Sequence, residues 1–371
     1  MRQPQPFHQR PERRTIMKPE WKELLIDSGA EFDPDNEHEV ASFGNVERER
    51  RATLGGTVIC DLSHIGLIQA YGDDTVTFLQ GQLTNDVEQV SPDKSLLAAF
   101  CNPKGRALAT FRLFQRDQTI YMTVACDLLE DTLKRLRMYV LRSKVTLEDG
   151  NDALVRFGIS GSDAEDELEQ ALGGYPANVD EAAVLRGITV IRVPGPAPRF
   201  EMYGELDDMQ KLWTALNVRC APVGAENWRL LDILGGIPTI SAGTSEAFVP
   251  QMINYEVIGG VSFQKGCYTG QEVVARMHYL GAPKRRMYLV HFDIDEVPEP
   301  GAKLFSTEDE QSVGAVVMGA HHPDGGVETL SVIKTAIADG DYPIMLGDLD
   351  GPVGTVAPPP YDFPPPKEKK S

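Results

Sequence analysis

The chain of 371 residues has only five cysteines, and no two of them form a CxxC pair. They are odd in number and far apart, at Cys60, Cys101, Cys126, Cys220 and Cys267. This distribution argues against a disulfide framework and against a four-thiolate zinc or iron–sulfur site. It is typical of a cytoplasmic protein with reduced thiols, and the sequence presents no set of metal ligands.

Positive charge is also scarce, with 36 Lys and Arg residues against 55 Asp and Glu residues and a formal net charge of -19. A field of this sign repels a phosphate backbone, so we expect no tight direct binding of nucleic acid. Long apolar runs are missing as well, and none approaches the roughly 20 residues that span a bilayer. We therefore expect no membrane partner. The remaining composition is that of a globular protein of about two or three domains.

Both ends of the chain are poor in apolar residues. Residues 1–50 are predicted to be a disordered leader with a short helix over residues 19–27, and the acidic segment 31–39 is predicted to be a surface loop. No apolar segment of a secretory signal follows the four arginines of residues 1–16. The tail, residues 358–371, is rich in Pro and Lys and is predicted to be disordered.

Hydrophobic periodicity between these ends predicts two α+β units and a small all-β part. In the first unit we expect strands at 58–62, 67–71, 96–101, 107–114 and 119–125, and helices near residue 76 and at 128–140. In the second unit we expect strands at 154–159, 188–193 and 200–203, and helices at 163–172 and 206–216. A further helix is predicted at 226–234. From residue 287 to about 356, short apolar runs broken by Gly and Pro favour a small antiparallel sheet or barrel.

The stretch 263–276, FQKGCYTGQEVVAR, has the pattern of a tight exposed loop tied to a buried element. Gly266 and Gly270 permit a sharp backbone turn around Cys267. Lys265 stands two residues from the thiol, and a nearby ammonium favours the reactive thiolate. The alternative is a glycine-rich turn whose cysteine is a small buried hydrophobe, and composition alone does not decide between them.

The same stretch resembles the signature of the YgfZ family, folate-binding relatives of the glycine-cleavage T protein (aminomethyltransferase). Four further segments resemble family motifs and occur in the same order, between about residues 57 and 357. They are GDDTVTFLQGQLTND at 72–86, CNPKGR at 101–106, FVPQMINYE at 248–256 and GAPKRR at 281–286. In WRLLDILGGIP, Asp232 and Leu234 stand where many relatives carry a basic residue before an acidic one.

The resemblance implies an α+β fold with two interleaved α+β units of the aminomethyltransferase folate-binding type and a small C-terminal β-barrel, around a central channel. Residues 51–150 together with 218–285 would form a discontinuous folate-binding domain, residues 151–217 a second α+β domain, and residues 286–357 the barrel. We expect a monomer.

The resemblance also implies that tetrahydrofolate, or a one-carbon derivative of it, binds in the channel. The expected function is that of an accessory factor in assembly or repair of iron–sulfur enzymes, including those that methylthiolate tRNA, so the effect on tRNA is indirect. The expected partners are folate and iron–sulfur client enzymes. Two alternatives stay open: a one-carbon transferase of the T-protein type, and a folate-binding module without catalysis.

The candidate catalytic and folate-binding residues can be named from the sequence. Cys267 and Lys265 are the candidate catalytic pair, and Lys265 has the alternative of plain exposure. The candidate folate-binding residues, each with a structural alternative, are Lys104, Arg106, Glu201, Tyr268, Gln271, Glu272 and Arg276. Of these, Lys104, Arg106 and Arg276 could meet the glutamate tail, and Tyr268 could pack on the pterin. Glu201, in RFEMYG, resembles a T-protein position near folate.

Overall fold

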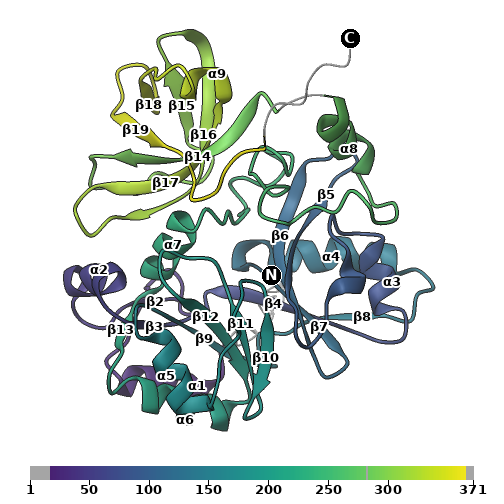
Figure 1. Ribbon diagram of the computed structural model, residues 1–371, viewed down its shortest axis with the longest axis vertical. Coiled ribbons are helices and arrows are strands. Elements are labelled where there is room, and N and C mark those ends of the chain that lie inside the picture. The colour runs from purple at the N-terminus through teal and green to yellow at the C-terminus, as the bar shows by residue number, and fades with distance from the viewer. Residues whose placement is uncertain (1–16, 281–282, 365–371) are drawn as a thin grey trace, which may run out of the picture.

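The computed structural model describes residues 17–280 and 283–364 and consists of two sheets with helices below a barrel (Figure 1). The predictions for residues 1–16 and 365–371 lie outside the described residues. None of the helices in the described part combines the length and the apolarity that a membrane span requires.

The first sheet is five-stranded and antiparallel. Its order is β5 (Leu96–Cys101), β6 (Ala107–Arg116), β7 (Thr119–Ala125), β4 (Ile65–Tyr71) and β8 (Thr146–Asp149). Two helices belong to it, α3 (Thr75–Gln80) and α4 (Leu129–Val140). The predicted spacing in α4 is confirmed, because Leu129, Leu133 and Leu136 are buried in the hydrophobic core of this sheet. β5 is buried along its whole length, as its apolar sequence predicts.

The second sheet is six-stranded. Its order is β10 (Ala182–Leu185), β11 (Ile188–Arg192), β12 (Arg199–Gly204), β9 (Val155–Ser160), β3 (Val58–Asp61) and β13 (Ala221–Val223). Its pairs are antiparallel except β13 with β3. Helices α5 (Ala164–Leu172) and α6 (Leu206–Leu216) contribute Leu168, Leu212 and Trp213 to its core.

The two sheets are interleaved in sequence. β3 precedes every strand of the first sheet, yet it pairs with β9 of the second. β3 belongs by sequence to the predicted first unit, and all four of its residues are buried between β9 and β13. The division into domains stays a prediction, while the predicted fold class is confirmed by the two interleaved units and the closed barrel.

Residues 17–55 pack on the second sheet. Helix α1 (Pro19–Asp27) coincides with the predicted helix, and Trp21 on it is 1% exposed. The Trp21 ring stacks on Phe157, and its Nε1 donates to Asp61 Oδ1 at 2.7 Å. The strands β1 (Glu31–Phe32) and β2 (Val40–Ser42) follow, and then α2 (Val46–Gly55), which the sequence reading missed. Apolar anchoring therefore orders most of the predicted leader.

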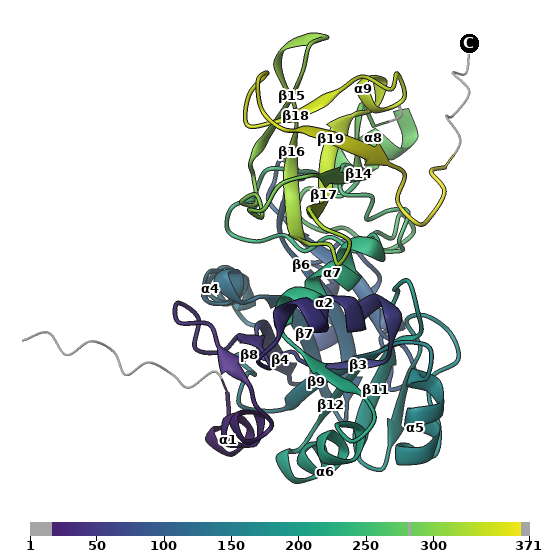
Figure 2. The same cartoon turned by 90° about the vertical axis from the view of Figure 1, so that its left-hand side faces the viewer.

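The closed barrel has the strand order β14 (Arg285–Phe292), β17 (Val327–Lys334), β16 (Asp309–His321), β15 (Lys303–Ser306), β18 (Ile344–Leu346) and β19 (Val353–Ala357). Helix α9 (Thr335–Ala338) follows β17. Alternating burial along β14 points Val290 and Phe292 into the barrel core. Helix α7 (Ala225–Leu234) lies between the barrel above it and α2 and β3 below it (Figure 2).

Residues 358–364 leave the barrel and form a strap over the end of α7. Tyr361 Oη donates to the carbonyl oxygen of Gly236 at 3.0 Å, and Phe363 packs against Arg286 and Tyr288. The predicted disorder is wrong for this part of the tail, because Tyr361 forms hydrogen bonds to the loop after α7 and Phe363 packs against the barrel core.

Candidate functional site

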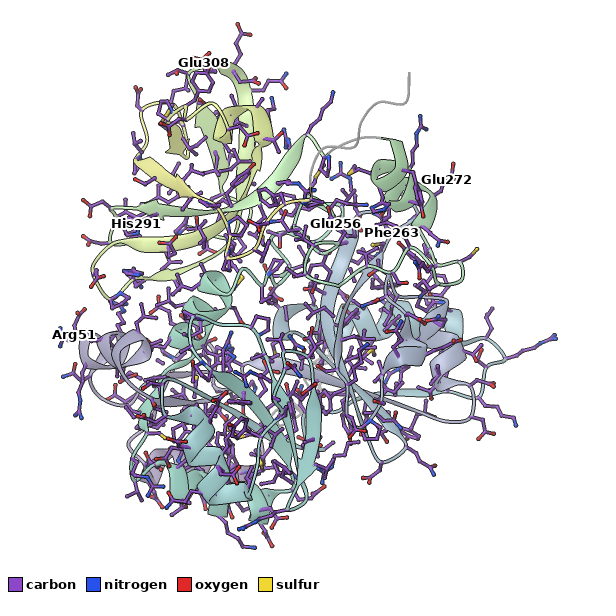
Figure 3. The ribbon with its side chains drawn as sticks, viewed as in Figure 1. Arg51, Glu256, Phe263, Glu272, His291 and Glu308 are labelled. Carbon is purple, nitrogen blue, oxygen red and sulfur yellow. The ribbon has the colours of Figure 1, made fainter. Side chains whose placement is uncertain are left out.

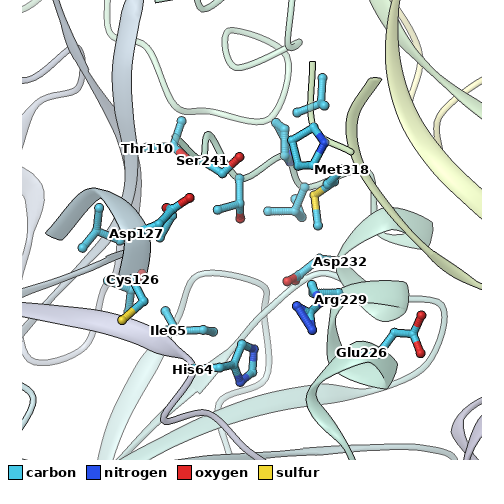
Figure 4. Close-up of a pocket in the computed structure, with 18 of the residues that line it drawn as sticks. His64, Ile65, Thr110, Cys126, Asp127, Glu226, Arg229, Asp232, Ser241 and Met318 are labelled. Carbon is cyan, nitrogen blue, oxygen red and sulfur yellow. The ribbon is translucent and has the colours of Figure 1, made fainter. Parts of the chain in front are cut away.

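A cavity of about 780 Å³ lies where the first sheet, the second sheet, α7 and the barrel meet (Figure 4). β6 contributes Thr110 and Arg112 to its wall, and the chain after β7 contributes Cys126 and Asp127. The barrel contributes Met318 from β16. A junction of domains is the usual place for a small-molecule site, and this volume is in the range of such sites.

Buried polar groups form one part of the wall. Arg112 is 6% exposed, and its guanidinium donates to Asp180 Oδ1 at 2.5 Å and to Ser95 Oγ at 3.0 Å. Glu201 on β12 is 8% exposed and accepts a hydrogen bond from Tyr203 Oη on Oε2 at 2.8 Å. Burial raises the pKa of Glu201, although the charge of Arg112 counteracts this. The hydrogen bond of Glu201 to the described residues uses Oε2, so Oε1 can accept from a ligand.

Helix α7 presents three charged side chains to the cavity at a spacing of three residues, Glu226, Arg229 and Asp232. Each of them has a partner of opposite charge. Asp232 Oδ1 accepts from Arg199 Nη1 at 2.7 Å, Arg229 pairs with Glu39, and Glu226 pairs with Arg50 and His321. Burial favours a raised pKa for Glu226, but the contacts with His321 outweigh it and lower the pKa overall.

His64 and Cys126 line the same cavity from the chain before β4 and after β7. Burial raises the pKa of the Cys126 thiol and lowers the pKa of His64 well below its usual value. Both groups are therefore neutral at physiological pH. The thiol is in its unreactive form, and the imidazole can act as a neutral hydrogen-bond partner.

The predicted signature loop, which we define as residues 265–270, lies at an outer corner of the molecule. Its first residue is fixed by the backbone at the end of α3. Lys265 Nζ donates to the carbonyl oxygens of Gln80, Leu83 and Asn85 at 2.6, 2.6 and 2.8 Å. Burial lowers the pKa of Lys265 to about 8, although the charges of Asp86 and Glu88 counteract this. The ammonium thus anchors the loop.

The loop packs closely on the turn at 102–106. Gly270 has φ +83, and a Cβ there would lie 2.4 Å from the carbonyl oxygen of Asn102. Gly105 has φ +72, and a Cβ there would lie 2.9 Å from Val273 Cβ. Two predicted motifs that are distant in sequence therefore meet, and each of these glycines is required by a close backbone approach.

The thiol of Cys267 is exposed at this corner, whereas Tyr268 is buried with 7% exposure. The ring of Tyr268 lies under Lys265, whose Nζ is 5.3 Å from the ring centroid. Helix α8 (Gln271–Leu280) follows the loop and carries Glu272 on the outside of the molecule (Figure 3).

The structure thus divides the predicted site residues between two places. Glu201 lines the cavity. The signature corner holds the others: Lys104, Arg106, Lys265, Cys267, Tyr268, Gln271, Glu272 and Arg276. Arg106 donates there to the carbonyl oxygens of Glu246 and Ala247, while Lys104 and Arg276 are exposed. None of these corner residues is part of the described cavity wall. Their predicted roles stay predictions.

Sequence reasoning missed most of the cavity wall. Asp33, Asn36 and Glu39 belong to the segment predicted to be a surface loop, but they line the cavity. The spacing of Glu226, Arg229 and Asp232 on a predicted helix was a usable signal. The sequence contains no comparable signal for His64 and Arg112, because the residues that face them in the cavity are distant in sequence.

Comparisons with known proteins show the family of this chain. Residues 21–193 match the family described as GCVT N-terminal domain. The tRNA-modifying protein YgfZ of Yersinia pseudotuberculosis serotype IB (strain PB1/+) is 33% identical over 309 residues, which cover 82% of this chain and 92% of that protein. The tRNA-modifying protein YgfZ of Yersinia enterocolitica serotype O:8 / biotype 1B is 32% identical over 308 residues, with the same shares covered.

A solved structure shares the fold. The crystal structure of glycine cleavage system aminomethyltransferase T from Bartonella henselae matches with a TM-score of 0.68 at 16% identity, over 90% of this chain and 94% of that one. The sequence relatives cover most of both chains, so this chain belongs to the YgfZ family of tRNA-modifying proteins.

Proposed function

We propose that this protein binds tetrahydrofolate, or a one-carbon derivative of it, in the central cavity and acts as an accessory factor in assembly or repair of iron–sulfur enzymes. Its support of tRNA modification is then indirect, through the enzymes that methylthiolate tRNA. The observation that carries the proposal is the cavity at the junction of a GCVT-type fold, with the buried carboxylate of Glu201 open toward it.

The residues present fit a folate. The pterin ring is flat, largely apolar on its faces and rich in N–H donors along one edge. Glu201, whose side chain is largely buried, offers Oε1 as an acceptor for such an edge, and Ile65, Leu97, Phe111 and Met318 offer apolar surface to the rings. When bound, the reduced folate supplies a carrier for one-carbon units. Glu201 and Arg112, both largely buried in the wall, would orient it.

We propose a separate role for Cys267. Its thiol is exposed at the signature corner and is not part of the cavity wall, so its partner is a client protein and not the bound folate. An exposed thiol can attack an electrophile or contact iron during transfer. One thiol cannot hold a cluster, so the contact is shared with the client. The five free thiols support action in the cytoplasm, and we propose a monomer.

Complementation of a deletion strain tests the proposal. Wild type, Cys267→Ala and Glu201→Ala would be expressed at equal levels, with iron–sulfur enzyme activities and tRNA methylthiolation measured side by side. We expect wild type to restore both readouts and each variant to restore neither. Full restoration by both variants would refute the proposal. Glycine-dependent formation of methylene-tetrahydrofolate by the purified protein with a lipoyl carrier would favour the transferase alternative instead.

A further inference from the structure

The wall of the central cavity carries unpaired negative charge. Asp33, Asp127 and Glu299 line the cavity, and none has a cationic partner among the described residues. Within residues 17–280 and 283–364, Asp33 accepts only from the backbone N–H groups of its own turn, and Asp127 only from the N–H of Ala242. Figure 4 shows Asp127 on the opposite side of the hollow from Arg229 and Asp232.

The positive charges of the wall are already neutralised. Arg112 and Arg229 are its arginines in the described part of the chain, and no lysine of that part lines it. Arg112 pairs with Asp180, and Arg229 pairs with Glu39. An additional anion in the cavity would therefore find no unpaired cation and would face three carboxylates.

Folates differ in the pterin oxidation state, in the one-carbon unit and in the number of glutamates in their tail, and each added glutamate contributes one more carboxylate. Lys104, Arg106 and Arg276, the basic groups expected to meet such a tail, lie at the signature corner and not on the described wall. We infer that the cavity selects a reduced folate with a single glutamate and discriminates against polyglutamate forms by charge. This inference rests on the proposed function, and it names the ligand class of the same site.

The salt dependence of folate affinity distinguishes an electrostatic discrimination from a steric one. Charges about 10 Å apart interact appreciably in dilute buffer but are largely screened near 0.15 M salt. The penalty on a long anionic tail should therefore be largest at low ionic strength and should fade as salt is added. A steric penalty would not depend on salt.

Anoxic titration calorimetry with tetrahydrofolate monoglutamate and pentaglutamate, each at low and high salt, tests the inference. At low salt we expect the pentaglutamate to bind roughly threefold to tenfold more weakly, with the difference shrinking at high salt. Tighter binding of the pentaglutamate at low salt would overturn the inference and leave the proposed function standing. Absence of heat with both ligands would overturn the proposed function and the inference with it.

Matched variants locate the effect. Asp33→Asn combined with Glu299→Gln removes two wall charges without changing side-chain size. Glu308→Gln combined with Glu310→Gln removes the same charge from the far end of the barrel, where Glu308 points outward (Figure 3). We expect the first pair to reduce the difference between the two folates and the second pair to leave it unchanged. Equal effects of both pairs would refute the assignment to the cavity wall.

Discussion

Lys265 and Cys267 are two residues apart in the signature loop and have opposite environments. Lys265 is enclosed by three carbonyl oxygens, while Cys267 is exposed. The sequence suggested that the lysine activates the thiol. In the structure its donors are directed at the backbone near the end of α3, so we assign it a positioning role.

Lys265→Met tests this positioning role. The variant leaves three carbonyl oxygens at a partly buried site without their donor, which should lower the free energy of unfolding by roughly 2 to 4 kcal/mol. Thermal and urea denaturation measure the change, and Gln264→Met, at the exposed neighbouring position, is the control. Unchanged stability would mean that the lysine does not anchor the loop.

Cys267→Ala should behave in the opposite way. Because the thiol is exposed, we expect unchanged stability and unchanged folate affinity, together with loss of the ability to restore iron–sulfur enzymes. Cys101→Ser is the matched comparison, because Cys101 is 1% exposed and a buried hydroxyl there should cost about 1 to 3 kcal/mol of stability. A Cys267→Ala protein that complements fully would show that the thiol is dispensable.

At the scale of elements, the strap of residues 358–364 joins the barrel to the turn that leads from α7 into the cavity wall. Gly236 has φ +69, and a Cβ on it would lie 2.5 Å from Tyr361 Cε1. The next residues, Ile237 and Pro238, line the cavity. The strap therefore packs against the turn whose next residues form part of the cavity wall.

A double-mutant cycle measures this contact. Gly236→Ala in the full chain should cost roughly 2 to 4 kcal/mol, since the strained backbone and the clash with Tyr361 add. In a chain that ends at Ala357, only the backbone strain of about 1 to 2 kcal/mol should remain. Equal costs in both backgrounds, measured by urea denaturation, would show that the strap does not press on this turn.

At the scale of the whole molecule, the net charge of -19 opposes the binding of large polyanions such as tRNA. We expect no tight binding of tRNA, because phosphate contacts supply most nucleic-acid affinity and the overall field opposes them. A gel-shift assay with purified tRNA at low salt measures this, with an unrelated basic RNA-binding protein as the positive control. Tight, salt-sensitive binding would make the effect on tRNA direct.

The sequence predicted the parts that depend on local pattern. The strand at Thr119–Ala125 and the helix at Leu206–Leu216 agree residue for residue, because alternation and helical spacing are properties of neighbouring residues. Helix α2 was missed although Asn45 caps it, because its sequence is mostly polar. The cavity wall could not be predicted, since Asp33, Arg112 and Asp232 meet only when three distant segments fold together.

Binding of tetrahydrofolate to the wild type and to Glu201→Gln, measured by anoxic calorimetry, tests the central claim most directly. Glutamine keeps the shape of the side chain but removes the charged acceptor, and Glu205→Gln, exposed just beyond the same strand, is the control. We predict saturable binding to the wild type and the control, and affinity roughly tenfold to a hundredfold weaker for Glu201→Gln. Absence of binding to the wild type, or equal affinity for all three proteins, would contradict the account.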